Sequence, residues 1–212
     1  MAIAFDAASG NEYDGSGTSV TVAHTCTGDN RILFAVAVGS NESDTLTSCT
    51  YNSASMTLID KLQVSGDRWV YLFYLIAPAT GTNNLTANFS EITDPTINGA
   101  SYTGVSQTGQ PDSNNTGTAD STTLTISTTT VADNCWLVMG VKNTQSTPVA
   151  GTGTTRRDTG GAAGILDSNG AKSPAGSYSL EETQTPSGQM GGIIASFSPA
   201  VVTSFIPTIT IY

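Results

Sequence analysis

The run Ile32-Leu33-Phe34-Ala35-Val36-Ala37-Val38, closed by Gly39-Ser40-Asn41, decides the fold class of this chain. An unbroken apolar run that ends in turn residues is typical of a strand covered on both faces. Three more runs of this kind follow, at Trp69–Ile76, Cys135–Val141 and Ile193–Phe197. We therefore expect central strands at these four places, with other layers of the protein on either side of them.

Around these runs, apolar and polar residues alternate in shorter segments. Val20–His24, Leu85–Phe89 and Thr122–Ser127 alternate in this way, as expected of strands with one face in water. Ser55–Ile59 and Ile97–Thr103 also read as strands, and no stretch repeats with a helical period. The sequence predicts an all-β, antiparallel sandwich of jelly-roll type over residues 1–200, followed by an extended arm at 201–212.

The composition favours a surface built from hydroxyl and amide groups. Only 11% of the 212 residues are charged, and 17 acidic against 7 basic residues give a net charge of −10. Phosphates would be repelled by such a surface, so we expect no nucleic-acid partner. The longest apolar run is too short to cross a membrane, and the beginning of the chain does not read as a secretory signal. These features predict no membrane association and synthesis in the cytoplasm.

The arm at 201–212 is the strongest sign of assembly. It is apolar and β-branched, and an apolar segment of this kind is an aggregation hazard unless it is buried. We expect it to fold back on its own domain or to dock on a neighbouring subunit by strand addition. The predicted interface residues are Val201, Val202, Phe205, Ile206, Ile209, Ile211 and Tyr212.

Two polar stretches, 104–121 and 143–176, are predicted as long loops, with short strands possible around 152–157 and 164–167. Long loops either bind ligands or decorate one end of a sandwich. Tyr51, Tyr102 and Tyr178 are expected to be exposed, whereas Trp69, Tyr71 and Phe73 should share a buried face opposite Tyr74. The candidate ligand residues in or near the loops are Tyr102, Asp112, Asn114, Arg156, Arg157 and Tyr178.

Catalytic machinery is not apparent in the sequence. His24 is the single histidine, and its place on an alternating strand favours a packed side chain over a catalytic triad. A glycosidase needs only two carboxylates, but the candidates read as solvated loop and edge residues: Glu42, Asp44, Glu91, Asp94, Glu181 and Glu182. We expect a protein without enzymatic activity.

Metal ions and cofactors are not expected either. Asp112–Gly117 matches the start of a calcium loop, but Thr123 stands where a bidentate Glu is required. Cys26, Cys49 and Cys135 lack metal-ligand spacing and read as buried thiols, with a Cys26–Cys49 disulfide left open.

Several segments together resemble a family of structural proteins. They are Ala4–Ser9, His24–Gly28, Asn30–Leu33, Thr50–Asn52, Met56–Leu58, Leu75–Gly81, Ala100–Val105 and Ser196–Pro199. In this series the chain resembles jelly-roll-like structural proteins of tailed bacteriophages and related bacterial and metagenomic proteins, over roughly residues 1–200. No catalytic residues are carried over from that family.

The resemblance implies a virion protein that decorates or cements a capsid, or that belongs to a tail or fibre. The expected partners are a major capsid protein or another virion protein and further copies of the chain, in the virion. Two alternatives stay open. One is a carbohydrate- or receptor-binding module of a tail fibre or adhesin, with a glycan as ligand. The other is a jelly-roll glycosidase.

Overall fold

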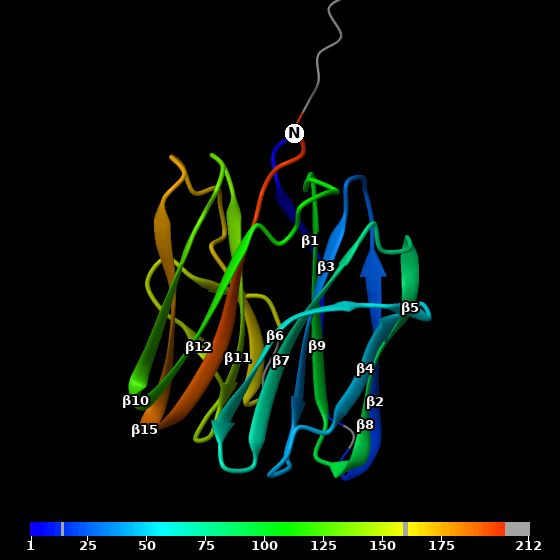
Figure 1. Ribbon diagram of the computed structural model, residues 1–212, viewed down its shortest axis with the longest axis vertical. Coiled ribbons are helices and arrows are strands. Elements are labelled where there is room, and N and C mark those ends of the chain that lie inside the picture. The colour runs from blue at the N-terminus through cyan, green and yellow to red at the C-terminus, as the bar shows by residue number, and fades with distance from the viewer. Residues whose placement is uncertain (14, 159–160, 202–212) are drawn as a thin grey trace, which may run out of the picture.

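The computed structural model describes residues 1–13, 15–158 and 161–201, and these fold into three stacked antiparallel sheets (Figure 1). The central sheet has the order β1-β9-β3-β7-β6, the flanking sheet β2-β8-β4-β5, and the curled sheet β10-β15-β11-β14-β13 with β12 beside β15. The central-sheet strands are β1 (Ala4–Tyr13), β9 (Thr96–Thr103), β3 (Ile32–Gly39), β7 (Arg68–Ile76) and β6 (Thr57–Ser65). The flanking-sheet strands are β2 (Gly17–Cys26), β8 (Gly81–Thr93), β4 (Leu46–Tyr51) and β5 (Ala54–Ser55). The curled-sheet strands are β10 (Ser113–Thr129), β15 (Ser177–Phe197), β11 (Trp136–Asn143), β14 (Ala163–Asp167), β13 (Thr155–Arg156) and β12 (Val149–Ala150).

Strand β3 lies in the middle of the central sheet and is buried on both faces, as its continuous apolar run predicts. Successive side chains of a strand point to opposite faces. Leu33, Ala35 and Ala37 therefore pack against the flanking sheet, while Phe34 and Val36 pack against the curled sheet. Two separate cores thus form on the two sides of one strand.

Strand β7 repeats this arrangement next to β3. Trp69, Tyr71 and Phe73 join the core under the flanking sheet, and Tyr74 packs against the opposite core, as predicted. Residues Tyr71 and Phe73 are almost fully buried, with 1% and 4% of their surface exposed.

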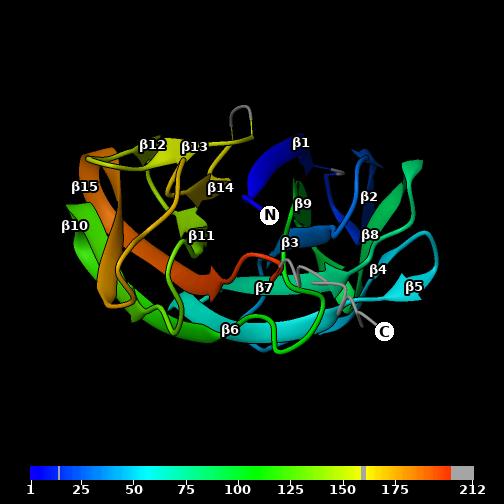
Figure 2. The ribbon, with the colours of Figure 1, turned by 90° about the horizontal axis from the view of Figure 1, so that it is seen from above.

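A third core forms because the curled sheet folds over itself (Figure 2). Residues 113–121 of β10 pair with 188–196 of β15, and after a register shift residues 123–129 pair with 177–183. After the shift, the last residues of β10 and the first residues of β15 cover the far face of β11 and β14. This core contains Leu124, Ile126 and Leu180 against Leu137, Met139 and Leu166.

The predicted all-β, antiparallel sandwich is confirmed, and the described residues include no helix that could span a membrane. The jelly-roll connectivity in particular stays a prediction. The predicted short strands are present as β13 and β14. The predicted loop at 104–121 is wrong from Ser113 onward, because β10 begins there. As an edge strand with mostly exposed side chains, β10 pairs through its backbone and needs few apolar residues.

Candidate functional site

The tyrosines predicted to bind a ligand are mostly inside the protein. Tyr102 is fully buried among the rings of Phe34, Trp136 and Phe197, and its hydroxyl donates to Asp167 Oδ2 at 2.8 Å. The expectation that Tyr102 is exposed is therefore wrong, because β9 lies within the central sheet.

The expectation for Tyr51 is wrong for a similar reason. Tyr51 is fully buried between the central and flanking sheets, and its hydroxyl donates to the backbone oxygen of His24 at 3.1 Å. Tyr178 is half-buried and donates to the oxygen of Pro174 at 2.7 Å. Each of these three tyrosine hydroxyls donates its hydrogen bond to another group of the protein.

The two arginines of the 143–176 segment hold that segment to the core. Arg156 forms a bidentate ion pair with the buried Asp158, at 2.6 Å and 3.1 Å. Arg157 donates to the buried Asp167 at 2.6 Å, and its guanidinium lies 4.2 Å above the ring centre of Phe5. Charge-assisted bonds of this kind are strong and directional. Both guanidinium groups therefore form ion pairs within the protein instead of facing a ligand.

The calcium-loop resemblance does not correspond to a loop. Residues 113–117 extend along β10, and Asn114 lies 3.4 Å from Asp60. Asp112 accepts a hydrogen bond from Cys135 at 3.4 Å, and all three cysteines are free and buried. Within residues 1–13, 15–158 and 161–201, no group of three or more His, Cys, Asp or Glu side chains could hold a metal ion.

His24 is a packed residue, as predicted. It is 1% exposed, and its Nδ1 lies 2.8 Å from the Ser9 hydroxyl. Burial lowers the pKa of His24 to about 4, despite the opposing charge of Asp6. Asp6 accepts hydrogen bonds from Thr27 and Ser101. Ser9, His24 and Asp6 therefore do not form the hydrogen-bonded relay of a catalytic triad.

One predicted surface carboxylate is in fact internal. Glu182 is fully buried, and burial raises its pKa to about 8 although Arg156 and Asn143 favour the charged form. With its amide nitrogen facing Glu182, Asn143 donates to Oε1 at 2.9 Å. Glu181 accepts a hydrogen bond from the backbone of Thr152 at 3.2 Å. Asp44 pairs with Lys61 and accepts a bond from Tyr71 at 2.7 Å.

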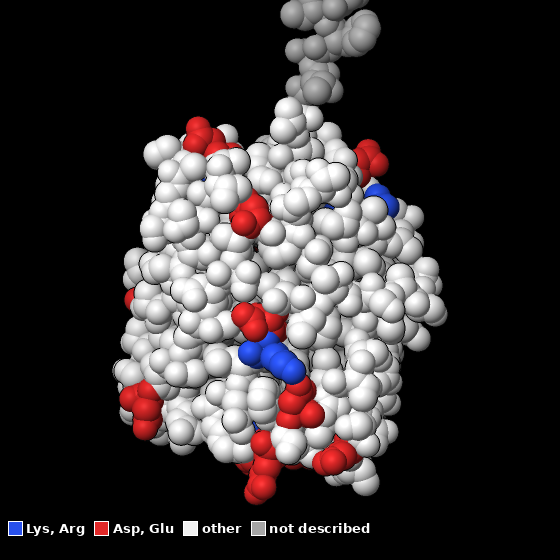
Figure 3. Space-filling model, viewed as in Figure 1, with Lys and Arg blue, Asp and Glu red and all other residues white. Residues whose placement is uncertain are grey.

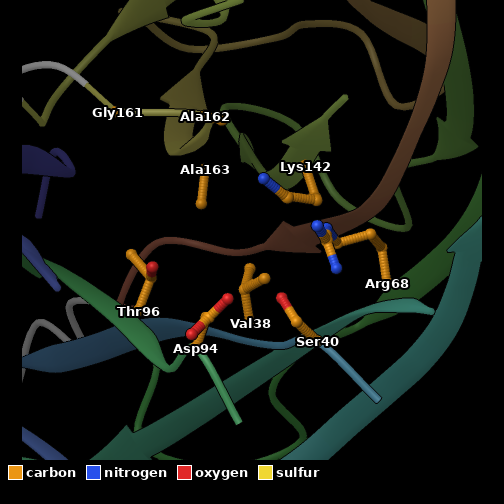
Figure 4. Close-up of a pocket in the computed structure, with 9 residues that line it drawn as sticks. All are labelled: Val38, Ser40, Arg68, Asp94, Thr96, Lys142, Gly161, Ala162 and Ala163. Atoms are coloured by element: carbon orange, nitrogen blue, oxygen red, sulfur yellow. The ribbon is translucent and has the colours of Figure 1, made fainter. Parts of the chain in front are cut away.

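A polar cleft of about 350 Å³ opens at the end of the molecule where β3 and β11 finish (Figure 4). Lys142 and Arg68 extend into it from one side, and Asp94, Ser40 and Thr96 line the other. Its remaining lining is Val38, Gly161, Ala162 and Ala163. The cleft joins the carboxyl end of β11 to the starts of β7 and β9.

Lys142 is the unusual group of the polar cleft. It is half-buried, and no hydrogen bond or ion pair connects its amine to the described residues. Burial and, to a smaller extent, the charge of Arg68 lower the pKa of Lys142 to about 8, although the charge of Asp67 opposes them. A desolvated cation beside a second cation favours an anionic ligand.

A larger, mainly apolar cleft of about 530 Å³ lies at the opposite end of the sandwich, beside the N label of Figure 1. It is lined by Met1, Ala2, Ile3, Asn134, Trp136, Ala171, Pro199, Ala200 and Val201. The backbone of Ala200 donates to Gly104 at 2.8 Å, which fixes the chain against the end of β9. Val201 then leaves the surface, with 86% of its side chain exposed. The other predicted interface residues, at 202–212, lie outside the described residues.

The fold and the two clefts described above define a layered β-sandwich protein with chemically different ends. No protein-family model, curated protein or solved structure matches the chain. The polar cleft was not among the sites predicted from the sequence. Its one signal is Lys142, a charged residue directly after the apolar run that ends at Val141.

Proposed function

We propose that this chain is a structural protein of a bacteriophage virion: a jelly-roll-type decoration protein that binds the particle surface and neighbouring copies. The observation that carries the proposal is the apolar cleft at the end where Val201 leaves the surface. The sequence that follows, Val-Thr-Ser-Phe-Ile-Pro-Thr-Ile-Thr-Ile-Tyr, is apolar, and docking on a partner surface would bury it.

The surface supports a role in a dense assembly. Figure 3 shows a face with few and scattered charged side chains, and the chain carries 24 charged residues in all, 17 acidic and 7 basic. Because few residues are charged, a surface of this kind can offer hydroxyl and amide groups for contacts with neighbouring subunits. The three packed cores support the body of the protein on which an attachment surface would be presented.

Light scattering tests the attachment surface in the full chain. The double variant Val202→Asp, Ile206→Asp places two charges in the apolar segment and is expected to convert an oligomeric wild type to monomers. Ile92→Asp is the matched control, because Ile92 is 67% exposed and lies outside the apolar cleft. If wild type and all variants had the same mass in solution, the claim that this segment mediates assembly would be refuted.

Mass spectrometry tests the virion role itself. Purified particles of a tailed phage that encodes this chain are expected to contain it in a fixed ratio to the major capsid protein. Its absence from intact particles would refute the proposal.

A further inference from the structure

We propose that the polar cleft is a binding site for an acidic sugar unit: a hydroxylated ring that carries one carboxylate. This inference goes beyond the virion role and does not depend on it. It rests on the groups that meet in the cleft: Lys142 and Arg68 on one side, and Asp94, Ser40 and Thr96 on the other (Figure 4).

The cationic side of the cleft selects for an anion. Lys142 is half-buried without a partner among the described residues, and Arg68 is paired only with its own neighbour, Asp67, at 2.7 Å. A carboxylate between the two cations would replace the water that the Lys142 amine has lost and would relieve the repulsion between Lys142 and Arg68. These are two of the seven basic residues of a chain with a net charge of −10, so their convergence runs against the overall composition.

The opposite side of the cleft limits what that anion can be. The carboxylate of Asp94 accepts hydrogen bonds and repels a second negative charge, while Ser40 and Thr96 offer hydroxyls. A polyphosphate or nucleic acid would bring several negative charges close to Asp94. A sugar acid presents one carboxylate to the cations and hydroxyl donors to Asp94.

The rest of the cleft fits a ring. Val38, Ala162 and Ala163 supply small apolar contacts for the C–H groups of a sugar, and about 350 Å³ accommodates a single ring with some of its water. The edge of the cleft at Ser40 is held in place by hydrogen bonds. Ser40 is fixed by the bond from its backbone nitrogen to Thr93 Oγ1, and Asn41 donates to the oxygen of Ile92 at 3.1 Å.

Calorimetry and saturation-transfer NMR with sodium glucuronate and sodium galacturonate test the proposal on the full chain. Saturable binding is expected for at least one of these acids, and little or none for glucose or galactose. Lys142→Gln and Arg68→Gln should each weaken it about tenfold or more, the usual effect of losing a charge-assisted bond. Lys172→Gln removes the same charge outside the polar cleft and should leave binding unchanged.

A pH series, one more variant and simpler ligands test the proposal further. Binding should weaken above about pH 8, where Lys142 loses its proton, with Arg68, Asp67 and Asp94 as its charged neighbours. Asp94→Asn should weaken the sugar acids but not acetate. If neutral sugars bound as tightly as the sugar acids, the role of the two cations would be refuted. If glycine or acetate bound as tightly, the site would recognise a carboxylate alone and not a sugar. No saturable binding of either acid would overturn the proposal.

Discussion

The buried carboxyl of Glu182 makes the stability of this protein depend on pH, and Glu182→Gln isolates that effect. Burial raises the pKa of Glu182 from 4.5 to about 8. A carboxyl with a raised pKa stabilises the fold fully below its unfolded pKa, and this contribution is lost as the pH rises toward the folded pKa. Between pH 4.5 and pH 7 the loss is at most about 1.4 kcal/mol for each of the 2.5 pH units, and partial titration near pH 4.5 reduces the total to about 3 kcal/mol.

Glutamine has nearly the same shape but no charge, so Glu182→Gln should be about 3 kcal/mol more stable than wild type at pH 7. At pH 4.5 the difference should nearly vanish. Urea unfolding at both pH values measures it, and Glu181→Gln controls for the loss of one negative charge from the half-buried neighbouring position. A Glu182→Gln protein that is less stable than wild type by the same amount at both pH values would refute the reasoning.

Three further changes should alter stability in defined directions. The pKa of His24 is lowered from 6.5 to about 4, so wild type should lose up to about 3 kcal/mol as the pH falls through that interval, and His24→Gln should remove this loss in acid unfolding curves. Tyr102→Phe removes a 2.8 Å bond to Asp167 and should cost about 1–3 kcal/mol in urea unfolding, whereas no loss would show that Asp167 is satisfied without it. Gly140→Ala would place its Cβ 2.5 Å from Val36 Cγ2 between two sheets and should cost about 1–3 kcal/mol, with a midpoint equal to wild type as the contrary result.

The strands were predictable where periodicity and burial agree. The continuous run at 32–38 and the face shared by Trp69, Tyr71 and Phe73 follow from the alternation of side chains along a strand. These local patterns identified central strands that contact two cores. The local patterns did not predict that the strands of the described residues form three sheets, because pairing between distant strands leaves little trace in the local sequence.

Polar residues inside strands account for most of the errors. Tyr102 follows Asn98 and Ser101 on β9, and this mixture resembles a wet surface. In the fold, Ser101 donates to Asp6 at 2.7 Å and Tyr102 donates to Asp167, so their polar atoms are satisfied inside the protein. Partners so far apart in the chain cannot be inferred from one sequence.

The buried carboxyl and the polar cleft were hidden for the same reason. Glu182 contacts Asn143 on another strand, and the cleft combines Lys142 of β11 with Arg68 of β7 and Asp94 of the β8–β9 connection. Each of these side chains reads as an ordinary surface charge on its own. Their unusual behaviour arises only from what the fold places beside them.

The two clefts should work independently, because β11 separates them and is rigid. Trp136 at its start lines the apolar cleft and Lys142 near its end lines the polar one, roughly 20 Å apart on an extended strand. Both faces of β11 are packed in cores, so a change at one end has no alternative packing through which to reach the other. The affinity for glucuronate should therefore be the same in wild type and in Val202→Asp, Ile206→Asp, even where the double variant changes the assembly state. A protein anchored through its apolar end would present the polar cleft outward, where an acidic glycan can reach it.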